Sequence, residues 1–177
     1  RGLGDVYKRQ ILAPAPQVPA AKIAEFQGLV TSMGAIPLQV ESQKHDYVTA
    51  AVSHLPHIVA AALVHLVQDH DDAQGLMKSI AAGGFKDITR IASSSPVMWE
   101  QICMTNTVNI SRLLQDYIDA LGVVQKELQE HDSASLYTFF DGARAYRDSF
   151  IDAGSGPIKK DYSIRLDIPC LLYTSPS

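Results

Sequence analysis

Apolar residues recur at helical spacing along most of the chain, and this pattern predicts an all-α bundle built on long helices. A first helix is expected over 20–33, and Gly34 suits its C-terminal cap. A long helix is expected over 41–70, where apolar positions cover more than one stripe, so it should be buried on more than one side. Pro56 lies inside this helix, removes a backbone hydrogen bond and is expected to kink it.

Short helices are predicted over 73–82 and 85–92, on either side of a break at Gly83-Gly84. A last helix is predicted over 133–153. Together with the earlier helices, these leave few residues for strands.

The longest predicted helix runs from Pro96 to about Glu130, with Ser95 placed to cap it. Apolar and small positions along it alternate spacings of four and three, at Cys103, Thr107, Ile110, Leu114, Tyr117, Leu121, Val124 and Leu128. This heptad seam predicts packing along another long helix.

Extended structure is expected in only three places. Residues 11–19 combine a strand end with a proline-rich connector, and 35–40 form an edge strand or an extended link around Pro37. After a linker, alternating residues over 162–168 predict one half-buried strand. One strand cannot fold alone, so it is expected to open a further, truncated domain.

The composition is that of a soluble globular protein, and 177 residues suffice for one domain. A net charge of -4 argues against nucleic acid or an anionic membrane as the main partner. The longest apolar run, 58–67, is interrupted by His65 and is too short to span a bilayer. No secretory signal is visible, which favours a cytoplasmic protein. Cys103 and Cys170 form no disulfide framework.

The two ends of the chain look foreign to the rest. Leu3–Gln10 reads LGDVYKRQ and Cys170–Ser177 reads CLLYTSPS, and codons for the two runs can be chosen as near reverse complements of each other. The pair resembles a translated sequencing adapter at both ends of a DNA fragment, rather than two natural termini of odd composition. Both natural ends are therefore expected to be missing.

Two histidines, His54 and His57, flank Pro56 and lie on adjacent faces of the predicted helix. Imidazoles near a helix break can present donors and acceptors to a polar ligand. Spacing alone favours an ordinary pair of core or surface histidines. A zinc site is weaker still, because a third ligand and an HExxH signature are lacking.

A second cluster follows Gly83-Gly84 and contains Asp87 and Arg90, three residues apart. The planar fork of arginine suits a carboxylate ligand, and the glycines allow a ligand to approach the backbone. The ordinary alternative is an intrahelical ion pair between Asp87 and Arg90.

A third cluster combines Trp99 with Asn106, Thr107 and Asn109. These polar residues interrupt an apolar seam, so they line a site or specify helix register. A lone tryptophan is more often a packing residue. Spacing alone identifies no reaction.

Two runs, HDYVTAAVSHLPH over 45–57 and GGFKDITRIASSSPVMW over 83–99, resemble the prephenate and arogenate dehydrogenase family. The resemblance covers 11–169. Together with the foreign ends, it implies the following layout: adapter translation over 1–10, the end of a nucleotide-binding domain and a connector over 11–19, a helical substrate and dimerisation domain over 20–155, a linker and the first strand of a truncated ACT domain over 156–169, and adapter translation over 170–177.

The family reaction is an oxidative decarboxylation, in which a nicotinamide takes a hydride, carbon dioxide leaves and the substrate ring becomes aromatic. The enzyme must hold the ring and draw off the hydroxyl proton. The resemblance implies that Arg90 binds a substrate carboxylate, that His57 hydrogen-bonds the substrate and that Asp87 orients its neighbours.

The resemblance also implies that Trp99 walls the pocket, that Gly83 allows close backbone approach and that His54 supports these residues. The family's catalytic histidine and glycine-rich loop for NAD or NADP belong to the preceding domain, so this polypeptide is expected to be inactive. A homodimer through the long helices and a tyrosine effector on the ACT domain are implied as partners. Nothing here separates prephenate from arogenate as substrate.

Two alternatives from other classes remain open. One is a helical dimerisation or scaffold module without a substrate site, which the heptad seam supports. The other is a metal-dependent helical enzyme that uses His54, His57 and a carboxylate.

Overall fold

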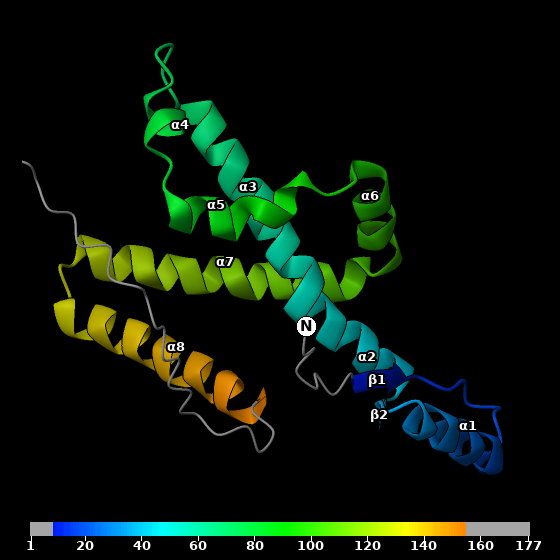
Figure 1. Cartoon of the computed structure of the whole chain (residues 1–177). Coiled ribbons are helices and arrows are strands. Elements are labelled where there is room, and N and C mark those ends of the chain that lie inside the picture. The colour runs from blue at the N-terminus through cyan, green and yellow to red at the C-terminus, as the bar shows by residue number, and fades with distance from the viewer. Residues whose placement is uncertain (1–8, 155–177) are drawn as a thin grey trace, which may run out of the picture. The chain divides into compact units, whose positions relative to one another are not determined.

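A computed structural model describes residues 9–154, without the side chains of 150–154, and it confirms the all-α prediction. The chain divides between Gly122 and Val123 into two compact units, each of which is described by itself. Figure 1 shows that helices dominate both and that two short strands lie together in the first. The strand expected over 162–168 and the C-terminal foreign run lie outside the described residues.

The two strands form a parallel pair joined by a helix. β1 (Arg9–Leu12) pairs with β2 (Ile36–Gln39), and α1 (Ala20–Ser32) connects them. The segment around Pro37 is therefore a strand. β1 also includes Arg9 and Gln10, two residues of the run expected to be foreign.

Gly34 ends the first helix as the sequence predicted. Its φ of 79° lies in the left-handed region, its N–H donates to Thr31 O and the Ala35 N–H donates to Val30 O. These two bonds form a Schellman motif, which glycine favours because it has no Cβ.

The predicted long helix is continuous over Ser42–His70, but it contains an irregular turn. α2 (Ser42–Thr49) leads into a π-turn (Ala50–His54), and α3 (Leu55–His70) follows. In a regular helix, the Pro56 ring clashes with the carbonyl four residues earlier. The wider turn directly before Pro56 accommodates the ring, so the predicted distortion is a π-turn.

The Ser42–His70 helix has 29 residues and a window of mean hydropathy 1.6, so by length and composition it could cross a membrane. This apolar helix is longer than the run 58–67, which by itself is too short to span a bilayer. Core helices of soluble proteins pass the same test. Only 11% of that window is buried, so the expected burial on more than one side is not seen in the described part of the chain, although α3 packs against α5 and the 3₁₀ turn that follows α5.

The next two helices differ from the prediction at their starts. α4 (Leu76–Ile80) begins later than expected, because the Asp71 and Asp72 carboxylates accept hydrogen bonds from backbone N–H groups up to Lys78. The glycine pair does not break a helix, since Gly83 is the first residue of α5 (Gly83–Thr89). A 3₁₀ turn (Arg90–Ser93) follows.

The prediction of one helix over 96–130 is wrong, because Asn106 divides it into α6 (Pro96–Thr105) and α7 (Thr107–Gln129). Asn106 has φ -123° and ψ 32°, outside the helical region. Its side chain donates to Asp46 O on α2 and accepts from Asn109 of α7. The predicted cap is confirmed, since Ser95 Oγ accepts a hydrogen bond from Met98 N.

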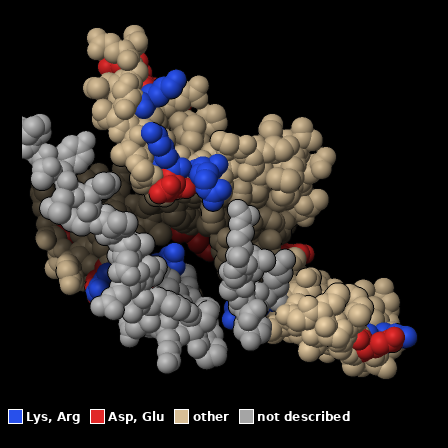
Figure 2. Space-filling model, in the orientation of Figure 1, with Lys and Arg blue, Asp and Glu red and all other residues tan. Residues whose placement is uncertain are grey.

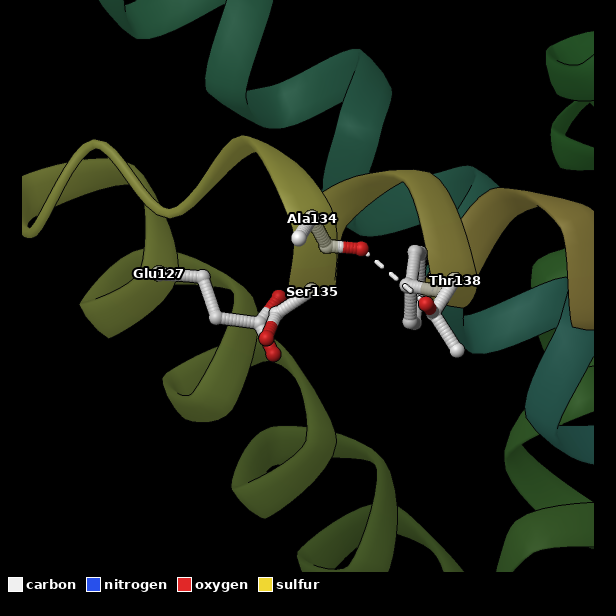
Figure 3. Close-up of a pocket in the computed structure, with 5 residues that line it drawn as sticks. Glu127, Ala134, Ser135 and Thr138 are labelled. Atoms are coloured by element: carbon white, nitrogen blue, oxygen red, sulfur yellow. Dashed lines mark hydrogen bonds between the residues drawn. The ribbon is translucent and has the colours of Figure 1, made fainter.

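The second unit contains the end of α7 and α8 (Ser133–Gly154), as predicted. His131, with φ 54°, turns the chain, and Asp132 accepts a hydrogen bond from Ser135 N at 3.1 Å to begin α8. A surface hollow of about 410 Å³ lies where the two helices meet (Figure 3), lined by Glu127, Ala134, Ser135, Thr138 and Phe139.

Few apolar side chains of the described part are fully buried. Val30, Ala50, Ala60 and Ile110 are buried, whereas Val108 remains 82% exposed. Exposed apolar surface on this scale is typical of a chain that packs against a partner.

Candidate functional site

The π-turn and the start of α3 bring two histidines next to Trp99 of α6. The His57 and Trp99 rings are stacked, with centroids 3.6 Å apart and an interplanar angle of 25°. The His54 ring meets Trp99 edge-on, with centroids 6.1 Å apart. Residues more than forty positions apart in sequence therefore form one aromatic cluster.

The ring orientation of His57 is fixed by a backbone contact. His57 Nδ1 lies 3.1 Å from Ser53 O, and a carbonyl oxygen only accepts, so Nδ1 carries the proton of this bond. In the neutral imidazole, Nε2 then keeps its lone pair and can accept a hydrogen bond.

His57 and Trp99 line a cavity of about 210 Å³. The cavity is bounded by α3, the 3₁₀ turn and α6, through His57, Ile58, Ala61, Ile91, Ala92, Ser94, Pro96, Trp99 and Cys103. Mostly apolar walls with one polar ring suit a small ligand with a hydrophobic body. A cavity of about 150 Å³ already holds benzene, so one six-membered ring fits here.

Larger hollows exist, but they contain none of the predicted site residues. One of about 360 Å³ adjoins β1 and α1, and one of about 520 Å³ lies between α3, α4 and α5. Size alone therefore does not identify the site, and the histidine–tryptophan cluster is the better guide.

Arg90 begins the 3₁₀ turn whose next two residues, Ile91 and Ala92, line the cavity. Arg90 itself does not line it; its side chain is exposed and has no ion-pair partner within the described range. Asp87 is also exposed, and the intrahelical ion pair with Arg90 is not formed there. Figure 2 shows basic side chains and an acidic one gathered over α5 and the start of this turn.

Gly83 lies at the start of α5 and is not one of the cavity-lining residues. A Cβ added to it would meet nothing within 4 Å, so the space beside its backbone is open. The structure thus groups His54, His57 and Trp99, whereas Gly83 and Asp87 lie on α5 and Arg90 lies at the start of the 3₁₀ turn that follows.

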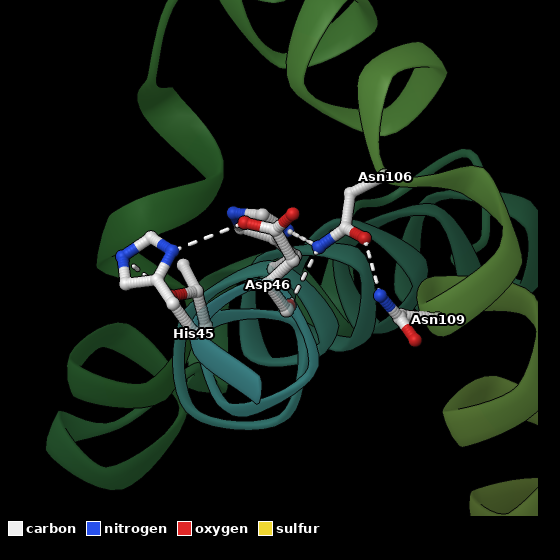
Figure 4. Close-up of polar contacts among 6 residues, drawn as sticks. His45, Asp46, Asn106 and Asn109 are labelled. Carbon is white, nitrogen blue, oxygen red and sulfur yellow. Dashed lines mark hydrogen bonds and ion pairs between the residues drawn. The ribbon is translucent and has the colours of Figure 1, made fainter. Parts of the chain in front are cut away.

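A polar network of His45, Asp46, Asn106 and Asn109 (Figure 4) reaches His54 through Asn106. Asn106 Nδ2 lies 2.8 Å from Asp46 O and 3.4 Å from His54 Nδ1. Asn109 Nδ2 donates to Asn106 Oδ1 at 2.8 Å, and His45 Nδ1 lies 3.0 Å from the Asp46 carboxylate. Asn106 and Asn109 were predicted to interrupt the apolar seam, but nothing in their spacing indicated this contact.

Burial lowers the pKa of His54 below its ordinary value of 6.5, and the neighbouring His57 lowers it further, while Asp46 acts in the opposite direction. The folded chain therefore holds the His54 proton more weakly than the unfolded chain does. The stability from this difference is present above pH 6.5 and is lost as the pH falls below 6.5 through the folded pKa.

We expect the free energy of unfolding to decrease as the pH is lowered from about 7.5 to about 5, and His54→Gln to reduce this decrease. Urea unfolding at a series of pH values measures it. His65→Gln, on the same helix but with an exposed ring, is the matched control and should keep the parent pH dependence. An unchanged slope in His54→Gln would contradict the expectation.

No group of three or more His, Cys, Asp and Glu side chains among residues 9–149 is arranged to hold a metal ion. The metal-dependent alternative built on His54, His57 and a carboxylate thus finds no third ligand in this part of the chain.

Comparison with known proteins identifies related sequences and folds. The family described as "Prephenate dehydrogenase, dimerization domain" matches residues 41–141. A prephenate dehydrogenase of Bacillus subtilis is 35% identical over 159 residues, covering 90% of this chain and 43% of the relative. One of Lactococcus lactis is 28% identical, covering 82% of this chain and 41% of the relative. The chain thus spans less than half the length of these two relatives.

Solved structures agree with these matches. A prephenate dehydrogenase from Aquifex aeolicus, in complex with hydroxyphenyl propionate and NAD+, superposes with a TM-score of 0.75 at 27% identity, covering 80% of this chain and 50% of that one. A Synechocystis arogenate dehydrogenase superposes with a TM-score of 0.77 at 22% identity, over 82% and 53%. This second likeness concerns the fold alone.

Proposed function

This chain belongs to the prephenate dehydrogenase family through its dimerization domain, and we propose that it is the part of such an enzyme that binds substrate and joins two protomers. The whole enzyme would carry out the oxidative decarboxylation of prephenate to 4-hydroxyphenylpyruvate in tyrosine biosynthesis. Arogenate is the alternative substrate, since the described site does not distinguish a ketone from an amine on the substrate side chain.

The observation that carries this proposal is the stack of His57 on Trp99 at the edge of a cavity large enough for one ring. Trp99 offers a flat apolar wall to the ring of the substrate. The Nε2 atom of His57 is left to hydrogen-bond it, because Nδ1 is bound to Ser53. His54 would hold Trp99 from the edge.

Arg90 would bind a substrate carboxylate. Arg90 begins the turn that lines the cavity, its guanidinium has no ion-pair partner among residues 9–149, and its planar fork can donate to both carboxylate oxygens. Asp87, on the helix just before it, would orient the arginine when substrate is bound. Gly83 would allow the substrate close to the backbone at the start of α5, where an added Cβ would meet open space.

The connection that leads from β1 into α1 does not fit a dinucleotide-binding loop. The connection between β1 and α1, 13–19, contains three prolines and no glycine, whereas a dinucleotide loop needs glycines so that its backbone can approach the pyrophosphate. NAD or NADP would therefore be bound by the portion of the full-length enzyme that this chain does not cover, together with the proton-accepting histidine.

The remaining partners follow from the same proposal. The long helices would pair in a cytoplasmic homodimer, and an ACT domain beginning near 156–169 would bind tyrosine as an effector. A dimerisation or scaffold module without a substrate site is the second candidate, and the exposed apolar surface supports it.

A chimera tests the proposal. Residues 11–153 replace the corresponding segment of the Bacillus subtilis relative, so that its own remaining part supplies the cofactor site. We expect prephenate-dependent NADH formation by the chimera and none by the 177-residue chain alone, measured by absorbance at 340 nm (roughly where reduced nicotinamide absorbs). A folded, dimeric chimera that binds no prephenate would favour the scaffold candidate.

A further inference from the structure

Asn106 lies at the break between α6 and α7, and its amide orientation is determined by its partners. Its Nδ2 lies 2.8 Å from Asp46 O, a carbonyl oxygen that only accepts hydrogen bonds. Its Oδ1 accepts from Asn109 Nδ2 at 2.8 Å. The NH₂ group therefore faces the Ser42–His70 helix.

The second hydrogen of this NH₂ group is available to His54, because Asn106 Nδ2 lies 3.4 Å from His54 Nδ1. The amide nitrogen has no lone pair to offer, so it can only donate, and Nδ1 must accept. A proton on Nδ1 would bring two donors together and leave one of them unpaired in a half-buried place.

We propose that Asn106 is a positioning residue that holds His54 as the tautomer protonated on Nε2 and, through the edge contact of His54 with Trp99, keeps the His57–Trp99 stack in place. His57 has the opposite tautomer, since its Nδ1 donates to Ser53 O. His54 thus keeps an Nε2–H donor, and His57 keeps an Nε2 acceptor. The spacing of the two residues along the helix does not by itself determine this difference. This role concerns the chain's own side chains and holds whichever substrate the cavity takes.

Among the groups around His54, Asn106 is the one that fixes the tautomer of the ring. His57 follows on the same helix, His45 and Asp46 lie on α2, and Trp99 faces the ring from α6. Among these groups only the Asp46 carboxylate favours a charged imidazole. The Asp46 carboxylate accepts a hydrogen bond from His45 Nδ1. The hydrogen-bond partner that the structure describes for His54 Nδ1 is therefore the amide of Asn106.

Long-range ¹H–¹⁵N correlation spectra of the ¹⁵N-labelled chain test the proposal directly. Neutral His54 should show the pattern of an Nε2–H tautomer, and His57 that of Nδ1–H. In Asn106→Asp, which keeps Oδ1 for Asn109 but places negative charge against His54, the midpoint of the His54 titration should rise by about one pH unit or more. Trp99, the only tryptophan, should change its fluorescence in the same variant.

Thr105→Ala is the matched control, because the Thr105 hydroxyl also lies at the break but bonds only carbonyls of its own helix. It should leave the His54 spectrum and the Trp99 emission unchanged. A wild-type spectrum with the proton on Nδ1 of His54 would overturn the proposal, even if the variants fail to fold. So would an Asn106→Asp chain that is folded and has the wild-type midpoint.

Discussion

Replacing Arg90 with alanine in the chimeric enzyme is expected to raise KM for prephenate by about 100-fold, with a smaller change in kcat. The reason is the loss of a charge-assisted, bidentate hydrogen bond to a carboxylate, worth about 1.5–3 kcal/mol. Arg90 has no ion-pair partner within residues 9–149, so little of this effect should come from lost stability. Initial rates at varied prephenate and saturating NAD measure it.

Two further variants make this expectation specific. Arg90→Lys should recover only part of the affinity, because an ammonium is a point charge without the planar fork. Lys86→Ala removes an exposed cation from α5, one turn before Arg90, and should leave KM near the parent value. If Arg90→Ala also keeps the parent KM, the carboxylate-binding role assigned to Arg90 is wrong.

The second large effect is expected in self-association. Phe140→Asp should shift the chain from dimer to monomer at micromolar concentrations, because it places a charge on an apolar face of α8. Phe140 is 65% exposed and Tyr137, one turn earlier, is 72% exposed, so both are free to contact a second protomer. Large exposed aromatic residues are the usual anchors of such interfaces. Light scattering after size-exclusion chromatography measures the mass.

The control for this variant is Ala145→Asp, which adds the same charge to the same helix on a different face. It should remain dimeric. A dimeric Phe140→Asp chain with unchanged dissociation on dilution would show that this face of α8 is not the interface. Circular dichroism of both variants checks that α8 still forms.

Features that depend on a few neighbouring residues were predictable from the sequence. Gly34 ends α1 because it adopts positive φ, and Ser95 caps α6 with Pro96 in the first turn. Both are local matters of backbone conformation and hydrogen-bond supply. For the same reason, the helix over 133–153 was correctly placed.

Features that depend on distant contacts were not predictable in this way. The heptad pattern favoured one helix over 96–130, yet Asn106 leaves the helix and bonds Asp46, which lies 60 residues earlier. α4 begins later than predicted because two aspartate carboxylates accept hydrogen bonds from backbone N–H groups. Periodicity describes one face of one helix and contains no information about such partners.

The candidate site shows the same division. The residues themselves were named from two sequence runs, but the stack of His57 on Trp99 arises only when α3 and α6 pack together. The position of Arg90 next to the cavity, and not in its lining, also depends on how the 3₁₀ turn meets α3. Its role and those of Asp87 and Gly83 stay predictions.

The π-turn over Ala50–His54 also has a consequence for how this segment tolerates insertions and deletions. A π-turn holds one residue more than an α-turn, so deleting the exposed Val52 would leave an unbroken helix. In a regular α-helix such a deletion rotates everything before it by about 100°, but here the narrower turn takes up the missing residue, so α2 and α3 would stay nearly in phase. Asp46 would still face Asn106, and the cost would instead fall on the Pro56 ring, which a regular turn brings against the carbonyl four residues earlier.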